Sequence, residues 1–176
     1  MPKFLFPLLT SGLLLAGAAA HAQASEVQAL TKRLNELMRD EQEPRTEAVV
    51  SLAGCGVRET VRKYRSANNP TSMNVSVSKS KDGSSWGVRT NDKVEFELSL
   101  GLDWSEIGAV SYQAQQREKD GRRYYELKLL RRPAADGKTA GLDSIDLPLY
   151  TQNEQEVAAL VRRLGALRRQ CSGQRG

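Results

Sequence analysis

Apolar and polar residues alternate along much of the chain between residues 72 and 149, as they do in strands that bury one face. The clearest run is residues 94–102, where valine, phenylalanine and leucine alternate with glutamate, serine and glycine. The strongest turn signal is Asp120-Gly121, because both residues tolerate the positive φ of a tight hairpin. With a further strand near residues 55–65, the pattern predicts seven strands, and their short connections make neighbouring strands antiparallel.

The spacing of apolar residues changes to three and four over residues 153–171, which predicts an amphipathic helix. Asn153 can cap the amino end of this helix, with Glu156 three positions later as its partner. Arg168 and Arg169 lie in the last turn, where positive charge complements the helix dipole. The helix needs a surface on which to bury its apolar stripe, and the sheet provides one. The stripe consists of Val157, Leu160, Val161, Leu164 and Leu167.

A second amphipathic helix is predicted over residues 25–40, followed by a linker at residues 41–45. The next stretch, residues 46–56, permits two interpretations. Its valines and alanines have helical spacing, whereas Gly54 and Gly56 are unfavourable inside a helix. We treat it as an apolar lead-in to the first strand and leave its secondary structure open.

The chain opens with Lys3, an apolar run over residues 4–20, and small-x-small sequences that end at Ala22 and Ala24. This arrangement is typical of a cleaved secretory signal peptide, and its short length favours a bacterial protein exported to the periplasm. A retained membrane anchor is the alternative. The expected organisation is a signal peptide at 1–24, an N-terminal helix and linker at 25–45, and a single domain at 46–176.

The two cysteines, Cys55 and Cys171, are an even number in a compartment that is expected to be oxidising, which predicts one disulfide. Two separate buried thiols are the alternative. The single histidine, His21, falls within the expected signal segment, which excludes histidine-based triads and histidine metal sites from the exported protein. Paired cysteines would also exclude thiolate chemistry. No metal ion and no cofactor are therefore expected.

Carboxylates are the main remaining candidates for catalysis, and Glu95 and Glu97 lie two apart on one strand. A glycosidase needs two carboxylates that face each other in a cleft, which neighbours on one solvated strand do not provide. An enzymatic function is therefore not expected. Trp86, Trp104 and Tyr124 are candidate binding aromatics, although a core or corner position is the favoured interpretation for both tryptophans.

Positive charge concentrates at the carboxyl end, where residues 157–176 contain five arginines and no acidic residue. Arg162, Arg163, Arg168 and Arg169 are therefore the candidate site for an anionic partner, such as a lipid surface, a glycan or an acidic protein. A solvated helix end is the favoured alternative. Nucleic acid is not an expected partner of an exported protein.

The order of the elements resembles that of the pleckstrin-homology-like barrel, and residues 98–107 (LSLGLDWSEI) resemble its strand-to-corner pattern. The resemblance implies an α+β fold, in which a seven-stranded antiparallel curved sheet or barrel is closed by the C-terminal helix, with the N-terminal helix added. It also implies a surface that binds lipid head groups or peptides, and no shared catalytic residues. A cystatin-like sheet-plus-helix domain is the alternative fold.

These observations favour a non-catalytic exported binding or interaction module of unknown ligand, whose partner would be an envelope component or a protein. Two other functions stay open. One is an inhibitor or immunity-type protein that blocks a toxin or a cell-wall hydrolase, and the other is a carboxylate-based hydrolase.

Overall fold

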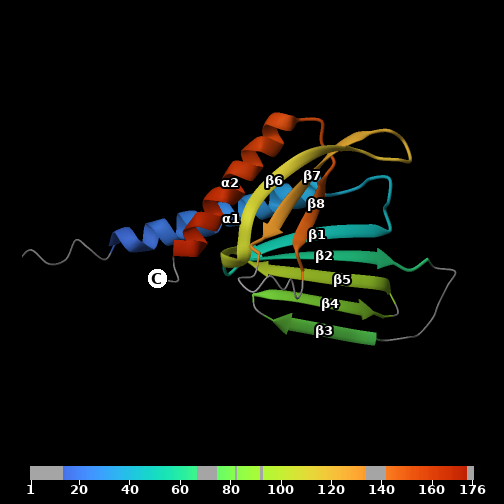
Figure 1. Ribbon diagram of the computed structural model, residues 1–176, viewed down its shortest axis with the longest axis horizontal. Coiled ribbons are helices and arrows are strands. Elements are labelled where there is room, and N and C mark those ends of the chain that lie inside the picture. Colours follow the sequence, from blue (N-terminus) through green and yellow to red (C-terminus); the bar gives the residue numbers. More distant parts are fainter. Residues whose placement is uncertain (1–13, 67–74, 82, 92, 134–141, 174–176) are drawn as a thin grey trace, which may run out of the picture.

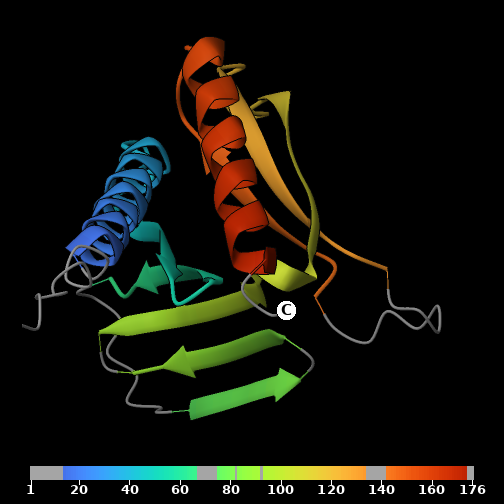
Figure 2. The ribbon, with the colours of Figure 1, turned by 90° about the vertical axis from the view of Figure 1, so that its left-hand side faces the viewer.

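The computed structural model describes residues 14–66, 75–81, 83–91, 93–133 and 142–173. These residues form an α+β fold with two helices and two antiparallel sheets, one of five strands and one of three (Figure 1). The helices and the small sheet lie toward one side of the large sheet, and β3 and β4 extend away from them (Figures 1 and 2).

The large sheet has the strand order β1-β2-β5-β4-β3, so β1 and β3 form its two edges. The stretch whose structure the sequence left open is strand β1, which pairs in register with β2. Gly54 and Cys55 connect the two strands with φ values of 59° and 57°, as a tight hairpin that follows the strand twist requires. The strands are β1 (Thr46–Ala53), β2 (Gly56–Tyr64), β3 (Val75–Lys81), β4 (Ser84–Thr90) and β5 (Val94–Asp103).

A short 3₁₀ turn, η1 (Trp104–Glu106), leads from β5 into the small sheet, which has the order β6-β7-β8. The expected seven-stranded antiparallel curved sheet or barrel is confirmed only in part: the strands are antiparallel, but β1 is an additional strand and no ladder joins the two sheets into a closed barrel within the described residues. The chain turns the corner at Trp104, which is 1% exposed, and begins a separate layer. The strands are β6 (Ile107–Gln116), β7 (Arg123–Arg131) and β8 (Ser144–Leu149).

Helix α2 (Glu154–Gly173) confirms the predicted C-terminal helix, and its apolar stripe is buried in the core except for Val161, which is partly buried against it. The Asn153 side chain caps it by accepting a hydrogen bond from the Glu156 backbone N–H at 3.2 Å. The Glu156 carboxylate does not complete a capping box. It accepts instead from the Arg33 guanidinium of the other helix at 2.5 Å, so the cap also joins the two helices.

Helix α1 (Leu14–Leu37) begins earlier than the predicted start at residue 25 and passes through the expected cleavage positions. It runs along β1, where the Asn35 amide accepts from the Val50 N–H at 2.6 Å and donates to the Val50 carbonyl at 2.9 Å. A helix side chain thus satisfies backbone groups at an edge strand, which protects that edge from other strands. Among the described residues, no helix has the length and apolarity needed to cross a membrane.

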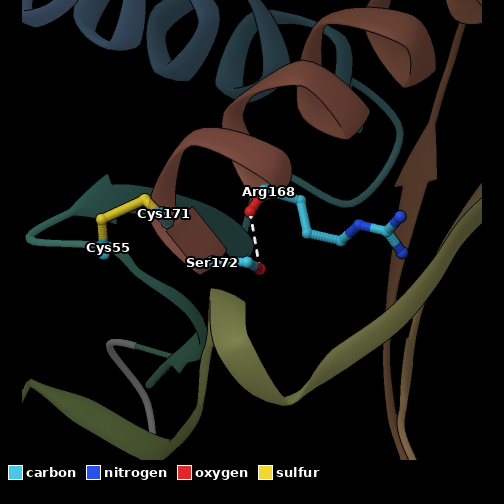
Figure 3. The surroundings of a disulfide bond; sticks show 4 residues. All are labelled: Cys55, Arg168, Cys171 and Ser172. Carbon is cyan, nitrogen blue, oxygen red and sulfur yellow. Dashed lines mark hydrogen bonds between the residues drawn. A yellow bond between two sulfur atoms is a disulfide. The ribbon is translucent and has the colours of Figure 1, made fainter. Parts of the chain in front are cut away.

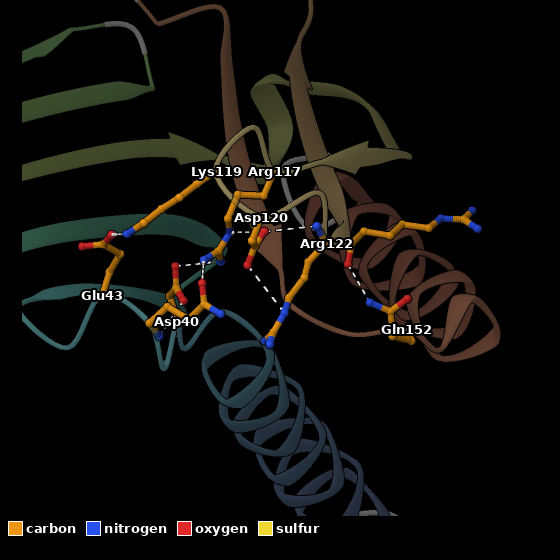
Figure 4. Close-up of polar contacts among 9 residues, drawn as sticks. Asp40, Glu43, Arg117, Lys119, Asp120, Arg122 and Gln152 are labelled. Carbon is orange, nitrogen blue, oxygen red and sulfur yellow. Dashed lines mark hydrogen bonds and ion pairs between the residues drawn. The ribbon is translucent and has the colours of Figure 1, made fainter.

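A polar cluster joins the β6–β7 hairpin to the segment that follows α1 (Figure 4). The Arg117 guanidinium donates to Asp40 and to Gln42, each at 2.8 Å, and its carbon lies 5.0 Å from the centre of the Tyr150 ring. Lys119 pairs with Glu43 at 3.2 Å. The hairpin is therefore anchored by ionic contacts that span the sequence.

Cys55 and Cys171 form the predicted disulfide, with their Cα atoms 5.5 Å apart and a sequence separation of 116 (Figure 3). The bond joins the β1–β2 turn to the last turn of α2. Closing a loop of this length stabilises the fold by roughly 5 kcal/mol on the chain-entropy account. It fixes the helix over the covered end of the large sheet.

Leu160→Asp should lower the free energy of unfolding by at least about 3 kcal/mol, because it places an unpaired charge in the core at a side chain that is 2% exposed. Gln155→Asp makes the same change of charge on the exposed face of α2 and should leave stability nearly unchanged. Urea denaturation followed by circular dichroism measures both, and a Leu160→Asp protein as stable as the control would mean that the stripe is not buried.

Candidate binding surface

The four arginines of the predicted anion site diverge around α2. Arg163 forms an ion pair with Glu26 of α1 at 2.7 Å, and Arg168 donates to the Gly108 carbonyl of β6. Two of the four guanidinium groups therefore have partners within the fold. Arg162 and Arg169 are exposed and, with Arg168, line a shallow depression of about 500 Å³ beside β6.

Arg162→Glu/Arg169→Glu should bind anionic phosphatidylglycerol vesicles as well as the wild type does. Only these two arginines of the set are freely exposed, and the charge of exposed side chains is screened within about 8 Å at physiological salt. Arg45→Glu/Arg122→Glu makes the same change of charge elsewhere on the surface and serves as the control. Vesicle sedimentation at low and moderate salt is the measurement. A salt-sensitive loss confined to the Arg162/Arg169 variant would instead identify this depression as an anion site.

The carboxylates considered for catalysis are engaged in ion pairs on the polar side of the large sheet. Glu97 accepts from Arg62 at 2.6 Å, and Glu95 lies 3.4 Å from the Lys63 amine. In the small sheet, Asp146 of β8 lies 3.2 Å from the Lys128 amine of β7. These carboxylates therefore form ion pairs with basic residues on the adjacent strands, which explains their positions without a catalytic role.

Glu59 is the acidic residue that the sequence analysis missed. It lies on β2 and is 6% exposed, opposite Val50 of β1 and Leu100 of β5. Burial, followed by the negative charge of Asp146, raises the pKa of its carboxyl from 4.5 to about 7. The strand period contains the signal for this placement, because Glu59 alternates in phase with Val57 on the apolar face.

Stability should fall as pH rises from about 4.5 to above 7, because the folded protein keeps a proton on Glu59 that the unfolded chain releases earlier. Relative to Glu59→Gln, the wild type should lose about 3 kcal/mol of unfolding free energy between pH 4 and pH 8. Urea denaturation across this range is the measurement, with Glu95→Gln as a surface control. Parallel pH profiles for wild type and Glu59→Gln would show that Glu59 does not titrate in this window.

The apolar face of the large sheet continues beyond the layer that covers it. Residues directly opposite in register share a face, which places Val77 of β3 beside Val88 of β4 and Leu98 of β5. The exposed fractions are 52% for Val77, 42% for Val75 and 39% for both Trp86 and Phe96. We call this surface the open face; it consists of the exposed side chains together with the half-buried Val88 and Leu98: Val75, Val77, Trp86, Val88, Phe96 and Leu98.

Positive charge accompanies the open face at the hairpin end. Lys79 lies opposite Trp86, and Lys81 lies opposite Ser84, so both lysines share the face of the exposed valines. Neither β3 nor β4 contains an acidic residue between its described ends. An apolar surface beside basic side chains favours a partner that combines apolar and acidic groups.

The reverse side of the same strands is polar. It forms a shallow depression of about 380 Å³ beside Gly87, whose missing side chain leaves room. The open half of the sheet therefore has two solvent-facing sides of different chemistry. The polar side is lined by Arg58, Ser76, Ser78, Ser80, Ser85, Arg89 and Ser99, among others.

The two tryptophans have different positions. Trp104 is buried at the corner between the sheets, as expected, whereas Trp86 is 39% exposed on the open face, which corrects the expectation of a core position. Tyr124 is half-buried, and its ring centre lies 5.8 Å from that of Tyr150. Of these three aromatic side chains, Trp86 is thus the one best placed to contact a partner, together with the equally exposed Phe96.

Comparison with known proteins found no matching family model, no matching curated protein and no matching solved structure. The resemblance to the pleckstrin-homology-like family stays a prediction.

Proposed function

We propose that the protein is an exported, non-catalytic binding module that holds an envelope component or a protein on its open face. The observation that carries this proposal is the exposure of Trp86, Phe96 and Val77 on one face of one sheet, where Val88 and Leu98 lie between them. Contiguous apolar side chains beside polar neighbours are typical of interaction sites, and aromatic residues contribute much of the binding energy in such sites.

The chemistry of the acidic groups supports binding over carboxylate catalysis. Glu95 and Glu97 are neutralised by basic neighbours on the adjacent strands, and Glu59 is buried beneath the sheet. A general acid or nucleophile must reach its substrate, and these three groups are not arranged to do so. Export is supported by the N-terminal apolar run and by the disulfide, which suits an oxidising compartment.

Trp86→Ser/Phe96→Ser should reduce capture of the partner from detergent-solubilised bacterial envelope by about tenfold or more, because the variant removes both aromatic rings of the open face. Leu130→Ser removes a side chain of similar exposure, 40%, from the small sheet and should capture as the wild type does. Quantitative mass spectrometry of the bound fraction is the measurement, after circular dichroism has confirmed that all three proteins fold.

Equal capture by all three proteins would contradict the open face as the binding surface. The identity of a captured partner distinguishes the functional alternatives. A single toxin or wall hydrolase whose activity falls on binding would indicate an inhibitor, whereas retention of lipid or glycan would indicate a module for envelope components.

A further inference from the structure

Strand β3 is an exposed edge of the large sheet. All seven of its residues are exposed, and all seven pair with β4 in an unbroken register. The opposite edge strand, β1, is covered by Asn35 of α1. The two edges of the large sheet therefore differ, and among the residues that the structure describes only the β3 edge presents an extended, regular backbone to solvent.

The register identifies which backbone groups of β3 point outward. Lys81 and Ser84 are partners across a two-residue turn, so this pair exchanges both ladder hydrogen bonds, and alternate pairs from there do the same. The intervening residues, Ser76, Ser78 and Ser80, direct their N–H and C=O groups away from β4. Such a row of donors and acceptors can pair with one more strand.

Pairing of β3 with β3 of a second copy is disfavoured by charge. An antiparallel pair centred on Ser78 would place Lys79 and Lys81 of each chain opposite Val77 and Val75 of the other. Four lysines would then gather in one interface with no acidic residue from either β3. Lysine on an edge strand is a known protection against self-association, and here it also selects the complementary partner.

We propose that β3 binds an extended acidic and apolar peptide segment of the partner protein by antiparallel strand addition. This inference rests on the proposed function, because the added strand would extend the open face. The peptide side chains on the same side as the open face would be acidic where they lie opposite Lys81 and Lys79. They would be apolar where they lie opposite Val77 and Val75. Read from its amino end, the segment has the pattern acidic-x-acidic-x-apolar-x-apolar.

The direct test is the affinity of the full chain for a labelled peptide of sequence Glu-Thr-Glu-Thr-Val-Thr-Val, measured by fluorescence anisotropy. Ser78→Pro removes one outward N–H without removing a ladder hydrogen bond to β4, and it should weaken binding by about tenfold. Ser78→Ala keeps that N–H and should bind as the wild type does. The peptide N-methylated at its central threonine should show the same loss against the wild type.

A charge swap tests the side-chain pattern separately. Lys79→Glu/Lys81→Glu should lose the acidic peptide and gain the peptide Lys-Thr-Lys-Thr-Val-Thr-Val, which the wild type should reject. Binding of the acidic peptide by the wild type should weaken as salt rises. If the two substitutions merely damaged the fold, the Lys79→Glu/Lys81→Glu variant would not bind the lysine-containing peptide either.

Three results would overturn the inference. They are absence of peptide binding by the wild type, equal binding by Ser78→Pro and Ser78→Ala, and a dimer in sedimentation analysis that Ser78→Pro dissociates. If envelope capture still depends on Trp86 and Phe96 in those cases, the open face stands as the binding surface and only strand addition fails. If capture does not depend on them but the peptide binds at the β3 edge, the proposed function fails instead.

Discussion

Burial of one apolar sheet face is the constraint on which the rest of this fold depends. Alternation along β1, β2 and β5 places Val50, Val57 and Leu102 on one side of the large sheet, where all three are 2% exposed. Removing that surface from water is the main favourable term in folding, and it requires a second layer. Two helices and the small sheet provide the layer, but it ends before the sheet does, and the open face is what remains (Figure 2).

Separate contacts attach the covering layer to the large sheet and hold the parts of that layer together. The disulfide joins α2 to the turn after β1, Asn35 joins α1 to β1, and Arg117 joins the β6–β7 hairpin to the segment after α1. Each contact links residues far apart in sequence and none involves β3. The ladder with β4 holds β3 in an extended conformation, so a partner strand would meet a backbone that needs little ordering on binding.

Local periodicity was sufficient to predict α2, its Asn153 cap and most strands, because these features depend on near neighbours in sequence. It failed where distant elements decide the outcome. Residues 46–53 are a strand because β2 pairs with them, and alternation could not reveal this. Alternation also assigned Trp86 to the apolar face of its strand, but whether that face is covered depends on how far α2 and β8 extend. The same dependence explains why the burial of Glu59 was missed, because that burial requires neighbours on β1, β5 and β8.

The distribution of charge on the surface also depends on contacts between elements that are distant in sequence. The sequence concentrates its excess of arginine at the carboxyl end, yet Arg163 and Arg168 have partners within the fold. Glu95 and Glu97 lie on the polar side of β5, where Glu97 pairs with Arg62. They do not share the open face with Lys79. Recognition depends on the charges that a partner meets at the contact surface. These charges can be positive even where the surrounding stretch of sequence has a net charge close to zero. A count of charges along the sequence therefore identifies α2 as the candidate binding element, whereas the register of the large sheet identifies β3.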